Sequence, residues 1–164
     1  MRTRSPLPSD RAALIALLDQ KSETISPNPF RPEEVACAIE LLEAALAQAE
    51  GNTYEARIVV DESDHPVSYA CFGATPMTEG TFDLYWLVTD ARARGQGLGA
   101  KLVAAVEDDL RARGALTVRV ETSSLEGQGG AVRFYERCGY GVSGRIADFY
   151  RPGDDLLTLT KRLR

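Results

Sequence analysis

Between residues 82 and 89, large apolar side chains occupy every second position in the chain. They are Phe82, Leu84, Trp86 and Val88. This alternation predicts a β-strand that buries one of its faces. Asp83 is expected on the face opposite Phe82, Leu84 and Trp86, because successive side chains of a strand point to opposite sides.

A helical pattern begins a few residues later. Its apolar positions recur at intervals of about one turn. They are Leu98, Leu102, Val106 and Leu110. Gly114 follows where a glycine commonly ends a helix. The connecting residues 92–99 include two arginines and three glycines, so the pattern predicts a strand, a glycine-rich loop and a helix in that order.

The remaining elements surround this unit. We expect a short edge strand within residues 2–8, helices over 10–21, 32–50 and 130–137, and strands over 57–60, 67–72, 116–121, 140–143 and 156–160. Three strands in meander order thus precede the first crossover helix, which is unlike a doubly wound fold. The strand at 116–121 is expected to run parallel to the strand at 81–89, because a helix crosses between them.

Composition limits the class of protein. The chain has 164 residues, of which 44% are hydrophobic and 26% charged, as expected of one globular domain. No apolar run is long enough to span a bilayer, and the N-terminus has no apolar signal core, so a cytoplasmic enzyme without a membrane partner is expected. The net charge of −5 argues against a nucleic-acid partner.

Cysteine and histidine content disfavours several catalytic classes. Cys37, Cys71 and Cys138 lie far apart and match no metal-binding spacing, so we expect buried, reduced thiols. His65 is the only histidine, and one histidine cannot by itself build a zinc site or a Ser-His-Asp triad. We therefore expect no metal, and neither a metallohydrolase nor a serine hydrolase.

The loop before the helix at residue 98 suits an anion. The first turn of a helix presents N–H groups without intrahelical partners, and glycines let ligand oxygens approach them closely. Arg92 and Arg94 add positive charge beside this turn. Gly95–Ala100 satisfies the dinucleotide fingerprint G-x-G-x-x-[GA], with Glu121 about 20 residues further on as a ribose-binding acid. The same loop also fits the pattern [QR]-x-x-G-x-[GA].

A second motif decides between these interpretations. Residues 131–140 resemble A-x-x-[FL]-Y-E-x-x-G-[FY], the closing motif of the GNAT superfamily of N-acetyltransferases, whose pyrophosphate loop has the pattern [QR]-x-x-G-x-[GA]. Both motifs occur in the order and at roughly the separation found in that family. A dinucleotide fold would pass almost directly from its strand into the glycines, whereas the polar residues 90–94 intervene here.

The resemblance covers about residues 56–163 of a single N-acetyltransferase domain at 1–164. It implies an α/β fold of the α+β type. Its central sheet would be mixed and mostly antiparallel, with a V-shaped splay between the central parallel strands and helices on both sides. The family also implies acetyl-CoA as cosubstrate, an amine acceptor and a monomer or homodimer.

Site residues follow from the resemblance position by position. A bulged strand would pair its backbone with the pantetheine arm at Leu87, Val88 and Thr89, and an N–H near Val88 would polarise the thioester carbonyl. The cofactor phosphates would contact Arg94, Gly95, Gln96, Gly97, Leu98, Gly99 and Ala100. Gln128 occupies the position of a cofactor-contacting asparagine in many members, in a loop whose alignment leaves this contact open.

The same resemblance implies the catalytic groups. Tyr135 matches the tyrosine that donates a proton to the departing CoA thiolate, and it would also contact the cofactor. Glu121 matches a general base of the N-terminal acetyltransferases of ribosomal proteins, and Asp83 is the alternative base. Residues 22–32 and 148–155 would select the acceptor, with Asp148 and Tyr150 as candidate contacts.

The expected activity is direct acetyl transfer from acetyl-CoA to a primary amine of a small molecule or peptide. Two alternatives stay open from the sequence. A non-catalytic acyl-CoA-binding module would bind the cofactor without transferring an acyl group. An NAD-binding oxidoreductase would use the glycine loop for a different cofactor.

Overall fold

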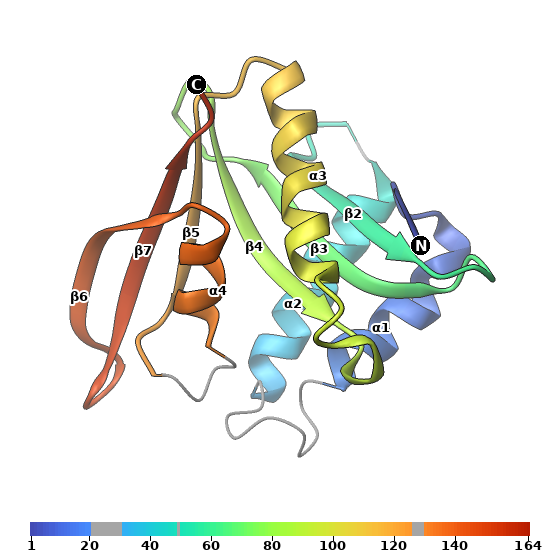
Figure 1. Cartoon of the computed structure of the whole chain (residues 1–164), viewed down its shortest axis with the longest axis horizontal. Helices are drawn as coiled ribbons and strands as arrows, with labels where there is room; N and C mark the ends of the chain where they lie inside the picture. The colour runs from blue at the N-terminus through green and yellow to red at the C-terminus, as the bar shows by residue number, and fades with distance from the viewer. Residues whose placement is uncertain (21–30, 49, 126–129) are drawn as a thin grey trace.

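The strand, glycine loop and helix lie at the centre of the structure, a computed structural model that describes residues 1–20, 31–48, 50–125 and 130–164 (Figure 1). β4 spans Thr81–Thr89, α3 spans Leu98–Ala112, and β5 spans Thr117–Ser123. The predicted apolar stripe of α3 is confirmed, because Leu98, Leu102, Val106 and Leu110 are all buried.

The other predicted elements are present with shifted ends. They are β1 (Arg2–Arg4), α1 (Arg11–Asp19), α2 (Pro32–Ala47), β2 (Tyr54–Val60), β3 (Pro66–Ala74), α4 (Ala131–Arg137), β6 (Gly141–Arg151) and β7 (Asp154–Arg162), with short 3-10 turns at Pro8–Asp10 and Ala91–Ala93. The largest difference is in the closing hairpin, where a turn was expected over 148–155. β6 instead continues to Arg151, because Asp155 accepts the backbone N–H of Asp148 at 2.8 Å and pairs with Arg145.

The sheet is mixed and mostly antiparallel, as expected. In the described part of the chain, its seven strands follow the order β1-β2-β3-β4-β5-β7-β6, and β4 with β5 is the parallel pair. Helices α3 and α4 cover one face and helices α1 and α2 cover the other (Figure 1). Each helix pair contributes to a separate core cluster against its own face of the sheet.

β4 and β5 separate soon after they begin. Their pairing joins Thr81–Asp83 to Thr117–Arg119 and then ends, while β5 continues along β7 as far as Ser123. Figure 1 shows the two strands starting side by side and diverging toward α4. This is the predicted V-shaped splay, and it opens space between the two central strands.

A bulge in β4 reverses the predicted alternation of its side chains after Leu84. Phe72 pairs with Leu84 and Cys71 with Trp86, so Tyr85 is an extra residue on β4. Phe82 and Leu84 pack toward α3, but Trp86 and Val88 pack toward α1 and α2. The expectation that Trp86 shares a face with Leu84 is therefore wrong, because one inserted residue reverses a period of two.

The cysteines differ in exposure. Cys71 is buried and Cys138 half-buried, but Cys37 on α2 is exposed, so the expectation of a buried thiol is wrong there. The apolar face of α2 instead buries Val35, Ala38, Leu42 and Ala45.

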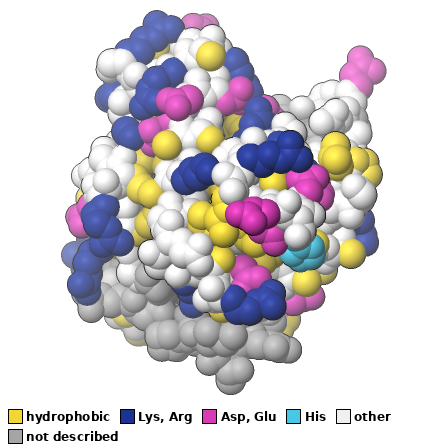
Figure 2. Space-filling view, turned by 45° about the vertical axis from the view of Figure 1, so that its right-hand side comes forward, with side chains coloured by type: hydrophobic (Ala, Val, Ile, Leu, Met, Phe, Trp, Pro, Cys, Tyr) yellow, Lys and Arg dark blue, Asp and Glu magenta, His cyan; other side chains and the backbone are white. Residues whose placement is uncertain are grey.

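Charged side chains of both signs are mixed on the face that carries His65, coloured cyan in Figure 2. Basic and acidic groups lie next to one another there rather than in separate regions. Within the described part of the chain, no helix is both long and apolar enough to cross a membrane.

Candidate active site

A cavity of about 500 Å³ opens where β4 and β5 separate. Its walls come from α2, β4, β5, α4 and the β6–β7 hairpin. Of the predicted catalytic and cofactor-binding residues that the structure describes, Asp83, Leu87, Glu121 and Tyr135 line it. The fold thus brings both candidate bases and the candidate acid into one space.

The glycine loop is shaped to receive an anion. Gly95 and Gly97 have φ angles of +77° and +73°, in the left-handed region that glycine adopts without strain. A Cβ atom at either position would meet nothing within 4 Å, so this face of the loop is open. Gly97 is the N-cap of α3 and provides no side-chain cap, which leaves the N–H groups of the first turn available.

Only one of the two loop arginines remains available to an anion. The Arg92 guanidinium donates to the Asp90 carboxylate at 2.8 and 3.2 Å, so its charge is already compensated. Arg94 is exposed and forms no ion pair with the residues that the structure describes. Arg94 is therefore the cation that can add to the field of the helix N-terminus.

Gly99 connects the loop to the cavity. A Cβ atom at this position would lie 3.2 Å from the Phe134 ring and 3.8 Å from Leu87 Cδ2. Gly99 therefore lets α3 approach both α4 and β4 closely. Because Leu87 also lines the cavity, the glycine loop and the cavity adjoin each other.

The backbone of β4 faces the splay at Leu87 and Thr89. Asp90 N–H donates to Val67 C=O at 2.9 Å, and Ser68 Oγ donates to Val88 C=O at 2.9 Å, so Asp90 and Val88 direct their backbone groups toward β3. Neighbouring residues of a strand point their backbone groups the opposite way. The N–H groups that face the splay are therefore those of Leu87 and Thr89, on either side of Val88.

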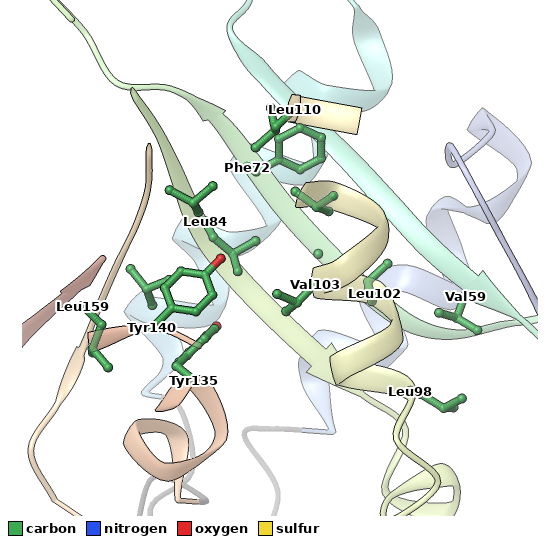
Figure 3. Packing of buried hydrophobic residues seen from close by; sticks show 14 of the residues in the cluster. Val59, Phe72, Leu84, Leu98, Leu102, Val103, Leu110, Tyr135, Tyr140 and Leu159 are labelled. Atoms are coloured by element: carbon green, nitrogen blue, oxygen red, sulfur yellow. The ribbon is translucent and has the colours of Figure 1, made fainter. Parts of the chain in front are cut away.

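Tyr135 is enclosed but reaches the cavity. Its side chain lies against Phe134 and Tyr140, with ring centroids 5.0 and 5.5 Å away in edge-to-face contact. Figure 3 shows Tyr135 and Tyr140 side by side between α4 and Leu84 of β4. Burial raises the pKa of Tyr135 above its ordinary value, with a smaller contribution from Cys138. The phenol therefore keeps its proton at neutral pH and can donate it.

The two candidate bases have different surroundings. Asp83 is buried, and its two oxygens accept from Arg119 Nε at 2.5 Å and from Thr75 Oγ1 at 2.8 Å. Glu121 is 44% exposed and lies 3.3 Å from Arg119. Glu121 is thus the carboxylate with an oxygen available to a molecule in the cavity.

The outer wall of the cavity includes side chains beyond the predicted set. Arg31 at the N-cap of α2, Glu34 within α2 and Arg119 of β5 line it, and none of them belongs to a recognisable local motif. Tyr150 also lines it, as expected for an acceptor contact. Burial raises the pKa of Tyr150, and the negative charges of Glu121, Asp154 and Glu34 add to this increase.

Several predicted residues lie elsewhere. Asp148 does not line the cavity, and its carboxylate accepts the Gly153 N–H at 2.7 Å within the hairpin. Gln128 and residues 22–30 of the expected acceptor loop lie outside the described residues. Among the residues described, no group of three or more His, Cys, Asp or Glu side chains could hold a metal ion.

Comparison with known families identifies a related group of proteins. Residues 19–140 match the model of the "Acetyltransferase (GNAT) family". A crystal structure from Desulfovibrio desulfuricans, described as belonging to the GNAT family, superimposes with a TM-score of 0.88 at 32% identity and covers 99% of both chains.

Two further relatives carry more specific descriptions. Blasticidin-S acetyltransferase from Streptomyces morookaense is 40% identical over 82 residues, which are 49% of this chain and 55% of that protein. The chain therefore spans about half the length of the curated relative it matches. The fold also resembles yncA from Salmonella typhimurium, whose structure contains its cofactor acetyl-CoA, with a TM-score of 0.73, 18% identity and coverage of 100% and 94%.

Proposed function

Because the chain belongs to the acetyltransferase (GNAT) family, we propose that it transfers an acetyl group from acetyl-CoA directly to a primary amine of a small molecule or peptide. The observation that carries this proposal is the cavity at the splay. It brings together an accessible carboxylate, a buried phenol and strand backbone beside an open glycine loop at the start of α3.

The residues present fit acetyl-CoA. The open first turn of α3, Gly95, Gly97 and Arg94 would hold its phosphates, because backbone N–H groups and a guanidinium are suitable partners for phosphate oxygens. The Leu87 and Thr89 backbone would hydrogen-bond the amide-containing arm within the splay. When bound, acetyl-CoA supplies an acetyl group activated as a thioester. The related Salmonella protein, which contains acetyl-CoA, supports this choice of cofactor.

The protein groups would then move two protons. Glu121 would accept a proton from the acceptor ammonium, directly or through water, which leaves a nitrogen lone pair free to attack. A β4 backbone N–H would stabilise negative charge that develops on the acyl oxygen. As the carbon–nitrogen bond forms and the carbon–sulfur bond breaks, Tyr135 would donate its proton to the sulfur. No side chain would become covalently acetylated.

The two alternatives differ from this proposal in measurable ways. Family membership replaces the dinucleotide interpretation of the glycine loop, since the same glycines lie in a GNAT domain. A non-catalytic module would retain the anion loop but would need neither Glu121 nor Tyr135. The match to an enzyme described as blasticidin-S acetyltransferase supports catalysis over simple binding.

The experiment combines binding with turnover. Acetyl-CoA at about 100 times its Kd should stabilise the protein by roughly 2.7 kcal/mol, while NAD should give no shift. Thiol release from acetyl-CoA is then followed with a panel of primary amines, and product masses should increase by one acetyl group. Binding without transfer to any amine would indicate the non-catalytic module, and stabilisation by NAD alone would contradict the cofactor assignment.

Gly97→Val is expected to weaken acetyl-CoA binding by at least about 10-fold. The substitution puts a β-branched residue at φ +73° and projects its side chain into the open space above the loop. Isothermal titration with acetyl-CoA measures this loss. Gly51→Val is the matched control, because Gly51 has φ +80° and equally open surroundings but lies outside the cavity wall. Equal acetyl-CoA affinity in the two variants would contradict the loop assignment.

A further inference from the structure

Asp83 and Arg119 form the last pair of residues that joins β4 to β5 before the strands separate. Their side chains also pair, with Arg119 Nε donating to Asp83 Oδ1 at 2.5 Å. Asp83 is only 6% exposed, and Thr75 donates to its other oxygen at 2.8 Å. The ion pair therefore links the side chains of β4 and β5 at the point where the sheet divides.

The same arginine extends toward Glu121. Val118 and Val120 of β5 are buried against α3 and α4, so the intervening Arg119 and the following Glu121 share the opposite face. Arg119 Nη1 lies 3.3 Å from Glu121 Oε1. One guanidinium thus contacts a buried carboxylate at the strand fork and an accessible carboxylate in the cavity.

The two contacts have different consequences. A planar guanidinium whose Nε donates to a buried carboxylate has fewer orientations than a free one, so its outer nitrogen favours one position for a second carboxylate. Glu121 by itself is a flexible side chain that is 44% exposed, and an isolated exposed ion pair would restrain it weakly. Because Arg119 is anchored by Asp83, its ion pair with Glu121 restricts the Glu121 side chain more than an ordinary surface ion pair would.

We propose that Arg119, anchored by Asp83, is a positioning residue that holds Glu121 toward the acceptor amine. This inference rests on the proposed function. It assigns Asp83 to the support of Arg119 rather than to proton transfer, because both oxygens of Asp83 are occupied. One oxygen of Glu121 lies 3.3 Å from Arg119 Nη1, and the other remains for the ammonium.

The test is a double-mutant cycle on kcat/KM for the amine. Arg119→Gln alone should reduce kcat/KM about 10-fold, and Asp83→Asn should have a similar effect because it releases the anchor. In a Glu121→Gln background, Arg119→Gln should lower kcat/KM by no more than about 2-fold further. The effects of residues that act through one another are not additive. Arg119→Lys, which keeps the charge but cannot bridge both carboxylates, should recover part of the rate.

Arg113→Gln is the matched control. Arg113 has a side chain 38% exposed, against 37% for Arg119, and pairs with Glu55 away from the cavity. Arg113→Gln should reduce thermal stability about as much as Arg119→Gln does, without changing kcat/KM. Acetyl-CoA affinity should stay at its wild-type value in Arg119→Gln and in Arg113→Gln. This result would separate an effect on Glu121 from damage to the fold.

A spectroscopic measurement keeps this inference distinct from the proposed function. The carboxyl carbon resonance of Glu121, identified by its absence in Glu121→Gln, should move in Arg119→Gln and stay in place in Arg113→Gln at fixed pH. Wild-type kcat/KM in Arg119→Gln, multiplicative losses in the double variant, or an unmoved resonance would overturn the positioning role. If the wild-type protein acetylates no amine, the proposed function fails, and the resonance still decides whether Arg119 holds Glu121.

Discussion

Glu121→Gln is expected to reduce kcat/KM for the amine about 100-fold. Glutamine preserves the size of the side chain but cannot accept a proton from the ammonium at neutral pH. Glu121 is 44% exposed and lines the cavity, whereas both oxygens of Asp83 are occupied, so Asp83 is not expected to replace it. Initial rates of thiol release over a range of amine concentrations measure the effect.

Glu79→Gln is the control for this variant. Glu79 is exposed in the loop before β4 and does not line the cavity, so the same chemical change there should leave kcat/KM unchanged. Glu121→Gln should also bind acetyl-CoA as tightly as the wild-type protein does. Wild-type turnover in Glu121→Gln would show that solvent water removes the proton without assistance from this carboxylate.

Tyr135→Phe is expected to lower kcat by about 10- to 100-fold, with little change in acetyl-CoA affinity. The substitution removes the hydroxyl that would protonate the departing sulfur and keeps the ring that packs against Phe134 and Tyr140. Burial raises the pKa of Tyr135, so the phenol stays protonated as pH rises through its ordinary value. Loss of this proton should therefore not limit kcat at neutral or mildly alkaline pH.

Tyr140→Phe provides the comparison for Tyr135→Phe. Tyr140 is buried in the same aromatic group, but it does not line the cavity. Removing its hydroxyl should leave kcat unchanged. Single-turnover measurements distinguish slow chemistry from slow product release, and an unaltered chemical step in Tyr135→Phe would remove the acid role from this residue.

The local pattern of hydrophobic and polar residues predicted most of the helices and strands, because each of these elements depends on residues that are close in the sequence. The α3 stripe is a property of one helix, and Gly95 and Gly97 take left-handed φ angles that their lack of a side chain allows. The mixed sheet also followed from element order, since a crossover helix implies a parallel neighbour. The predicted site residues remain predictions, although Asp83, Leu87, Glu121 and Tyr135 all line one cavity.

The bulge at Tyr85 illustrates what the pattern could not indicate. Nothing in the alternation of β4 marks an extra residue, because large side chains occupy both parities from Leu84 to Val88. The face of Trp86 was decided by the register with β3, which places Cys71 opposite it. A register is a relation between strands and depends on their packing as a whole.

The sequence by itself determined the family, the order of elements and the glycine loop before α3, because these depend on short motifs and local periodicity. Only the tertiary structure decided which carboxylate is accessible. Asp83 and Arg119 are 36 positions apart, and strand pairing brings them together where the sheet divides. Their contact occupies Asp83 and leaves Glu121 facing the cavity, because a buried charge needs a partner whereas a half-exposed one can remain accessible.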